Sequence, residues 1–144
     1  MKSFLAKLNE DRITDAIARV EQNATAEIRV HVEKRCKKQV LDRAAEVFAQ
    51  LNMHRTRYRN GALIYIAYLD HQFAILGDAG INHKVGPDFW EKEKQMLTDH
   101  FKEQKFTEGI CKVIEEIGAA LQKYFPFEPD DINELPDDIS FGDQ

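Results

Sequence analysis

The segment from Ala62 to Leu69, ALIYIAYL, constrains the fold more than any other part of the chain. It is almost wholly apolar and rich in β-branched and aromatic residues, which is typical of a buried β-strand. A strand that is apolar on both faces has to be covered on both faces, and helices are the usual cover. The sequence therefore predicts a sheet with helices on either side.

Two further strands flank this segment in the sequence. Asp70 and His71 are predicted to form a two-residue turn that leads into a second apolar strand, Gln72–Leu76, and then into a glycine loop, 77–86. Upstream, Ala26–Glu33 alternates between apolar and polar residues. This alternation predicts a strand with one buried face and one wet or edge-facing side, which carries Glu27, Arg29, His31 and Glu33.

Amphipathic helices occupy most of the remaining chain. Apolar residues recur at helical spacing in Glu10–Gln22, which Asn9 can cap, in 40–51, in a helix that begins at Pro87, and in 106–125. A strand, a helix and a second strand in succession normally form a right-handed parallel crossover. We therefore predict one α/β domain over residues 1–127, a three-layer α/β/α sandwich with a small mixed sheet and helices on both faces, followed by an acidic C-terminal tail, 128–144.

This topology predicts which polar residues meet. The starts of two parallel strands and the end of the third should lie at one edge of the sheet, bringing together 25–27, 59–61 and 77–80. The opposite edge should collect 34–36 and 70–71.

The first edge would carry two carboxylates, Glu27 and Asp78. Calcium and magnesium favour carboxylate oxygens, so these two residues are the candidate ligands of a weakly bound divalent cation. The alternative is a pair of solvated carboxylates. Asn60 and Gly61 either present polar groups to a ligand or only form a turn.

Arg59, with Arg55 and Arg57 close by, can bind phosphate oxygens through its guanidinium group, or can belong to a solvated loop. Asp70 is a further acidic candidate, at the turn between the second and third strands. The two cysteines and five histidines show no metal-binding spacing, which argues against a zinc site.

Composition narrows the class of protein. The net charge is −5, and the tail is acidic without Lys or Arg, so bulk charge does not favour a nucleic-acid partner. No apolar run is long enough for membrane insertion, and the N-terminus does not resemble a secretory signal, so we expect a cytoplasmic protein. In the tail, Ile132, Leu135, Ile139 and Phe141 alternate with acids. The tail therefore either docks on a protein partner or only solvates the chain.

The middle of the chain resembles the TPM-domain family. The resemblance rests on Asn60-Gly61 before the apolar strand, the acidic turn at Asp70, the glycine loop at 77–80, the upstream strand ATAEIRVHVE and the helical stretch FKEQKFTEGICKVIEEI. It implies an α/β/α sandwich. It also implies the activities reported for members of that family, which are acid phosphatase activity, calcium binding, or assistance in assembling membrane complexes.

From the residues and the resemblance together, we expect a TPM-like binding or assembly module with weak affinity for calcium or magnesium at one edge of the sheet. The alternative is a phosphatase-like hydrolase that uses Glu27, Asp78 and Asp70 for metal or proton transfer and Arg59 for phosphate. The binding module is preferred because two or three separated carboxylates do not by themselves position a water and stabilise a pentavalent transition state.

Overall fold

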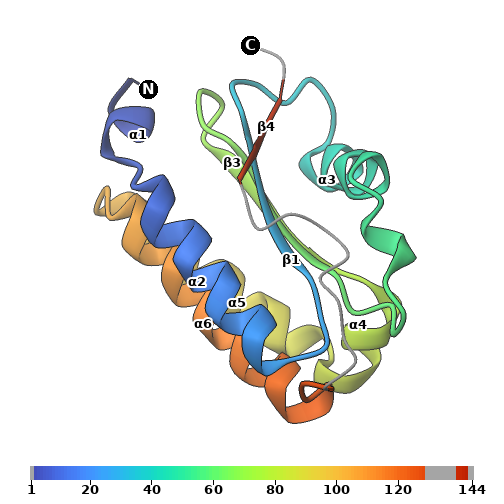
Figure 1. Cartoon of the computed structure of the whole chain (residues 1–144). Coiled ribbons are helices and arrows are strands. Elements are labelled where there is room, and N and C mark those ends of the chain that lie inside the picture. Colours follow the sequence, from blue (N-terminus) through green and yellow to red (C-terminus); the bar gives the residue numbers. More distant parts are fainter. Residues whose placement is uncertain (1, 129–138, 143–144) are drawn as a thin grey trace.

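A computed structural model describes residues 2–128 and 139–142, and its centre is a four-stranded mixed sheet (Figure 1). The strand order is β3-β2-β1-β4. β1 (Ile28–Glu33) and β2 (Ala62–Ala67) run parallel, whereas β3 (Gln72–Gly77) returns antiparallel to β2. The predicted directions of the three main strands are confirmed.

Helices cover both faces of the sheet. Figure 1 shows α2 (Glu10–Asn23), α5 (Pro87–Lys102) and α6 (Phe106–Tyr124) on one side, and α3 (Val40–Gln50) on the other. The short helix α1 (Lys2–Lys7) precedes α2, and the 3-10 turn η1 (Met53–Arg55) follows α3. The three-layer α/β/α architecture is therefore as predicted.

β2 separates two hydrophobic cores. Its residues alternate between them, so that Ile64 and Ile66 pack with α2 and α6, while Leu63 and Tyr65 pack with α3. Every residue of β2 is buried. The prediction that this strand is covered on both faces is confirmed.

Helix boundaries follow local capping chemistry. Asn9 caps α2 as predicted, because its side chain accepts a hydrogen bond from the Arg12 amide. The prediction of an irregular glycine loop over 77–86 is wrong in its centre, where α4 (Ala79–Val85) forms. Asp78 caps α4, and Gly86, with φ 77°, ends it.

The prediction of a wet face on β1 is also wrong. Glu27, Arg29, His31 and Glu33 are all 4–6% exposed. Polar residues alternate along β1 although water does not reach them. The reason is that the buried polar groups bind one another. Glu33 illustrates this arrangement: it accepts two hydrogen bonds from Arg43 of α3, each at 2.9 Å, and one from the Tyr65 hydroxyl.

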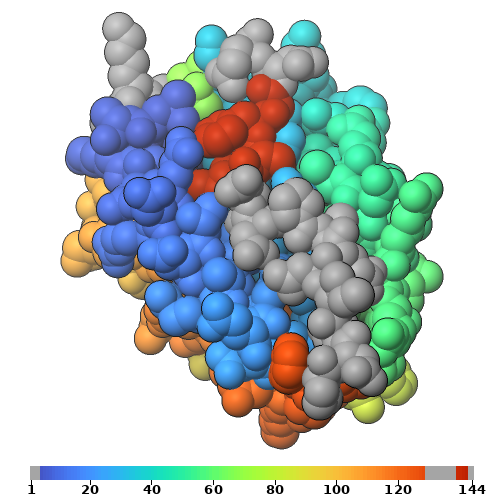
Figure 2. Space-filling view, in the orientation of Figure 1, coloured from blue at the N-terminus to red at the C-terminus, as the bar shows by residue number. Residues whose placement is uncertain are grey.

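The acidic C-terminal segment takes part in the fold at the residues that the structure describes. β4 (Ser140–Phe141) pairs in parallel with β1, and Ile139 is buried in the larger core. In Figure 2 the red atoms of 139–142 lie between the blue N-terminal helices and the blue-green region of α3. Ile132 and Leu135 lie outside the described residues. The division into a domain of 1–127 and a tail stays a prediction, but residues 139–142 belong to the sheet.

The buried ion pair between Glu33 and Arg43 gives a stability prediction. Glu33→Gln should lower the free energy of unfolding by about 3 kcal/mol, because it leaves the Arg43 guanidinium beside the sheet with only the more exposed Glu46 as its anion. Glu46→Gln is the matched control. Glu46 binds the same arginine from a more exposed position, so its replacement should cost much less stability than Glu33→Gln. Urea denaturation of the three proteins measures both values.

The same pair predicts the acid dependence. Burial alone would raise the pKa of Glu33, but hydrogen bonds from Arg43 and Tyr65 outweigh burial and hold the pKa at about 2. A folded-state pKa below the unfolded value contributes stability that is present above the unfolded pKa of 4.5 and is lost as pH falls toward 2. The difference between the parent and Glu33→Gln should therefore shrink over this range. A difference that stays constant from pH 6 to pH 2.5 would contradict the account.

Candidate functional site

The predicted edge of the sheet exists, and backbone hydrogen bonds define it. The amide of Ala62 donates to the Glu27 carbonyl, and the amide of Asp78 donates to the Gly61 carbonyl, each at 2.9 Å. Glu27, Gly61 and Asp78 therefore form one row across the starts of β1 and β2 and the end of β3. The structure brings Glu27, Arg59, Asn60 and Asp78 to this edge.

The two carboxylates share the edge but are not adjacent. Two strand spacings, about 10 Å, separate the α-carbons of Glu27 and Asp78. Gly61 lies between them, and a β-carbon there would meet the Met53 carbonyl oxygen at 3.0 Å. Within residues 2–128 and 139–142, no group of three or more His, Cys, Asp or Glu side chains is placed to hold a metal ion.

Asp78 is engaged by its neighbours. Arg59 donates to it from Nε at 2.8 Å and from Nη2 at 3.0 Å, and the Ala79 amide donates at 2.7 Å. The hydrogen bonds and the charge of Asp78 raise the pKa of Arg59. Arg59 itself has a left-handed φ of 53°. Asp78 therefore occupies one side of the Arg59 guanidinium, and a phosphate that used the same donors would have to displace it.

Asn60 is a structural residue in this arrangement. It is 1% exposed, its side-chain amide donates to the Thr25 carbonyl, and its backbone amide donates to Thr56 Oγ1 at 3.2 Å. These bonds attach the loop before β2 to the start of β1. The crevice beside Asn60 and Glu27 has a volume of about 10 Å³, which is room for about one water molecule.

The acidic segment begins at the same edge. Glu128 accepts hydrogen bonds from Arg57 at 3.1 Å and from the Tyr58 hydroxyl at 2.6 Å. The arginine-rich loop predicted as a phosphate-binding or solvated element therefore makes one ion pair with Asp78 and another with Glu128.

Asp70 lies at the opposite edge, away from the other four candidates. It accepts a hydrogen bond from Arg35 at 2.8 Å and one from the Cys36 amide at 2.7 Å. These bonds fix the loop after β1 against the β2–β3 turn, where His71 has a left-handed φ of 53°.

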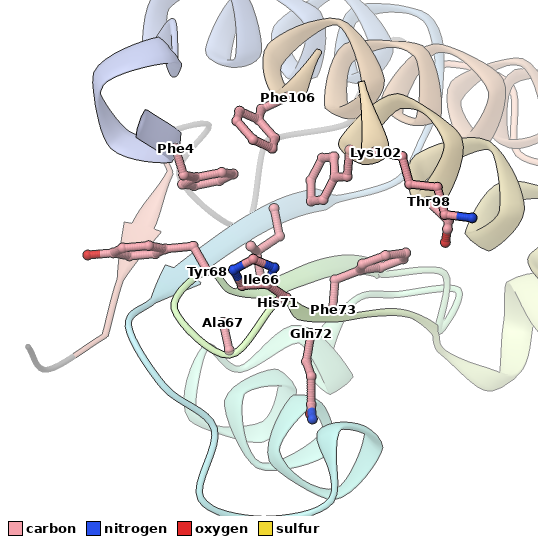
Figure 3. A pocket seen from close by; sticks show the side chains of 11 residues that line it. Phe4, Ile66, Ala67, Tyr68, His71, Gln72, Phe73, Thr98, Lys102 and Phe106 are labelled. Carbon is pink, nitrogen blue, oxygen red and sulfur yellow. The ribbon is translucent and has the colours of Figure 1, made fainter. Parts of the chain in front are cut away.

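A larger cavity lies on the helical side of the β2–β3 turn, and sequence reasoning missed it. Figure 3 shows the rings of Phe4, Phe73 and Phe106 turned toward a common space among α1, the hairpin and the facing ends of α5 and α6. The cavity measures about 270 Å³. Tyr68 and Phe101 complete its aromatic wall. Phe4 is central to the wall, because it stacks on Tyr68 at 5.4 Å and meets Phe106 edge-on at 5.0 Å.

The mouth of this cavity is polar and carries positive charge. Lys102, His71 and Thr98 are among its polar lining residues, whereas the Gln72 side chain points away from the aromatic rings in Figure 3, and the described residues that line the cavity include no Asp or Glu. Phe4 is the only buried side chain of α1 among those the structure describes, so α1 covers the cavity through one residue. The sequence signal for this cavity was Phe4, the one phenylalanine in an N-terminal segment to which no helix or strand had been assigned.

No helix within the described residues is both long and apolar enough to cross a membrane.

Comparisons with known proteins show which family the chain belongs to. The model of the TPM domain matches residues 1–120. Among solved structures, the chain is similar to the BA42 protein of the psychrophilic bacterium Bizionia argentinensis, determined by NMR. The two share 46% sequence identity over 94% of this chain and 95% of that one, with a TM-score of 0.86. No curated protein matches. The match spans most of the domain and agrees with the strand order and helix layers described above, and we conclude that the chain belongs to the TPM-domain family.

Proposed function

We propose that this TPM domain is a binding module and that the aromatic cavity is its principal ligand site. The observation that supports the proposal is the cavity itself, walled by five aromatic rings, with a lysine and a histidine at its mouth. Its volume of about 270 Å³ lies just below the usual range of ligand pockets, which is about 300–1,000 Å³. The ligand is accordingly a small molecule with an apolar or aromatic body.

The charge at the mouth specifies the other end of that molecule. Lys102 supplies a cation, and no carboxylate among the described lining residues opposes it. An anionic head group beside Lys102, with its body against Phe73 and Phe101, satisfies both parts of the cavity. We therefore assign the ligand class as small carboxylates with an apolar chain or ring. α1 would have to shift at Phe4 to admit them.

Octanoate, compared with octanol, tests this assignment by NMR titration. Octanoate should shift the ring signals of Phe4, Tyr68 and Phe101, and Lys102→Gln should weaken octanoate by roughly three- to tenfold, because it removes one exposed ion pair. Octanol should bind the parent and Lys102→Gln equally. Lys94→Gln replaces an exposed lysine of the same helix. It is the control and should change the affinity for neither octanoate nor octanol. An equal loss of octanoate affinity in Lys102→Gln and Lys94→Gln would contradict the proposal. NMR shifts spread over the whole surface would also contradict it.

A second candidate function is weak divalent-cation binding at the sheet edge, and the shared row of Glu27 and Asp78 supports it. Two carboxylates supply only part of the six or more oxygens that such a cation takes, with water filling the remaining positions. Asp78 would also have to release Arg59. Affinity should therefore be in the millimolar range or weaker, that of the weakest calcium modules, about 10⁻³ M.

One experiment separates cation binding from the hydrolase alternative. Calcium should shift the amides near Glu27, Asn60 and Asp78 in the parent, with smaller effects in Glu27→Gln and Asp78→Asn and no change in the control Asp15→Asn, which alters an exposed carboxylate on α2. p-Nitrophenyl phosphate should not be turned over with or without calcium or magnesium, because Arg59 is held by Asp78. Metal-dependent turnover that Asp78→Asn abolishes would overturn the binding module in favour of the hydrolase.

A further inference from the structure

Glu93 is a buried carboxylate without a hydrogen-bond donor. It lies on α5 against α6 and is 1% exposed, and within the described part of the chain neither of its oxygens receives a hydrogen bond. Glu33, equally buried, is bound by Arg43 and Tyr65. Burial of an unpaired carboxylate costs several kcal/mol, so Glu93 requires a cation or a proton.

Its neighbour is a second carboxylate. Glu116 of α6 lies close enough that the two carboxyl groups share a hydrogen bond once one of them holds a proton. Burial, followed by this hydrogen bond and the charge of Glu116, raises the pKa of Glu93 to about 8. At neutral pH the pair therefore retains one proton, and any bound cation has to replace it.

The pair lines an open surface cavity of about 390 Å³ between α5 and α6, to which Val85 of α4 also contributes. Glu93 is its one buried lining residue. The remaining wall is largely apolar and aromatic, with Phe89, Ala119, Ala120 and Tyr124. The wall also attracts an ammonium group within the chain, because Lys123 Nζ lies 5.1 Å from the centre of the Tyr124 ring.

The other charges near Glu93 do not neutralise it. Lys92 of α5 and Lys112 of α6 lower its pKa only in part, and Lys123 also borders the cavity. None of the ion pairs between described residues joins a lysine to Glu93. From α4 only the apolar Val85 lines the cavity.

We propose that this cavity binds an alkylammonium group, with the nitrogen between Glu93 and Glu116 and the methylene chain against Phe89, Val85 and Tyr124. An ammonium group offers three donors to two carboxylates, and its chain gains from an apolar wall. A calcium or magnesium ion would need at least six oxygens, of which two carboxylates supply at most four, and no other described residue that lines the cavity adds a carboxylate. A free alkylamine and the lysine side chain of a partner share this chemistry.

The proposal has a defined pH dependence. Below pH 8 the ammonium group competes with the shared proton, so its affinity should rise with pH by up to about tenfold per unit and level off above pH 8. The ligand stays charged throughout, because an alkylamine has a pKa near 10.4, about that of lysine. Binding at pH 7 should release up to one proton, which calorimetry in buffers of different ionisation enthalpy detects.

The test is titration with butylammonium, with butanol as the uncharged ligand. Glu93→Gln and Glu116→Gln should each weaken the binding of butylammonium at least tenfold at pH 8, because neither variant retains the carboxylate pair. Glu93→Gln should also abolish the pH dependence, whereas Glu116→Gln should move it to lower pH, because burial still raises the pKa of Glu93. Glu115→Gln removes an equal charge from the exposed face of α6 and should stay within twofold of the parent. Glu93→Gln should remain folded, because it removes a buried charge, and urea denaturation checks this.

A second ligand distinguishes a free alkylamine from the lysine side chain of a partner as the natural occupant. N-acetyl-lysine-methylamide should bind if the cavity takes a partner's lysine, whereas binding of butylammonium alone assigns it to free amines; either result supports the alkylammonium site. Unchanged affinity in a folded Glu93→Gln, equal binding of butanol, or calcium binding at this pair without amine binding would overturn the proposal.

Discussion

The hydrogen bonding of β2 between β1 and β3 is the constraint on which the rest of this structure depends. Its apolar residues face both cores, so the strand can be stable only with helices on either side. Its parallel register with β1 aligns Ile28 with Ala62, and its antiparallel register with β3 aligns Ala62 with Gly77. These two registers place Glu27, Asn60 and Asp78 at one edge and Asp70 at the other. The positions of all the candidate polar residues follow from this single strand.

The patterns that depend on backbone periodicity could be predicted from the sequence. The apolar run at 62–69, the cap at Asn9 and the helical spacing in 106–125 each have one dominant physical reading, and the structure agrees with all three. Helix α4 was missed because two glycines obscured a short helix that Asp78 caps. Period-two alternation in β1 indicated a polar face, but it could not reveal that Arg43, distant in sequence, would cover Glu33.

The candidate sites were predictable only where strand order fixes them. The edge containing Glu27 and Asp78 follows from topology, but the ion pair of Asp78 with Arg59 depends on a left-handed residue in the connecting loop. Neither cavity left a local signal in the sequence. The aromatic one combines Phe4, Tyr68 and Phe101 from three distant segments, and the acidic one combines Glu93 with Glu116 across two helices. Such sites arise from packing, which single-sequence patterns do not encode.

The buried acids divide into two kinds. Glu33 is bound by Arg43 and Tyr65 and serves the fold, whereas Glu93 has no hydrogen-bond donor among the described residues, which is the basis of the ligand site that we propose. Carboxyl-detected NMR titration of the parent protein tests this division most directly. Glu33 should remain ionised down to a pKa of about 2, and Glu93 should titrate at about 8. Ordinary values near 4.5 for both carboxyls would contradict the account.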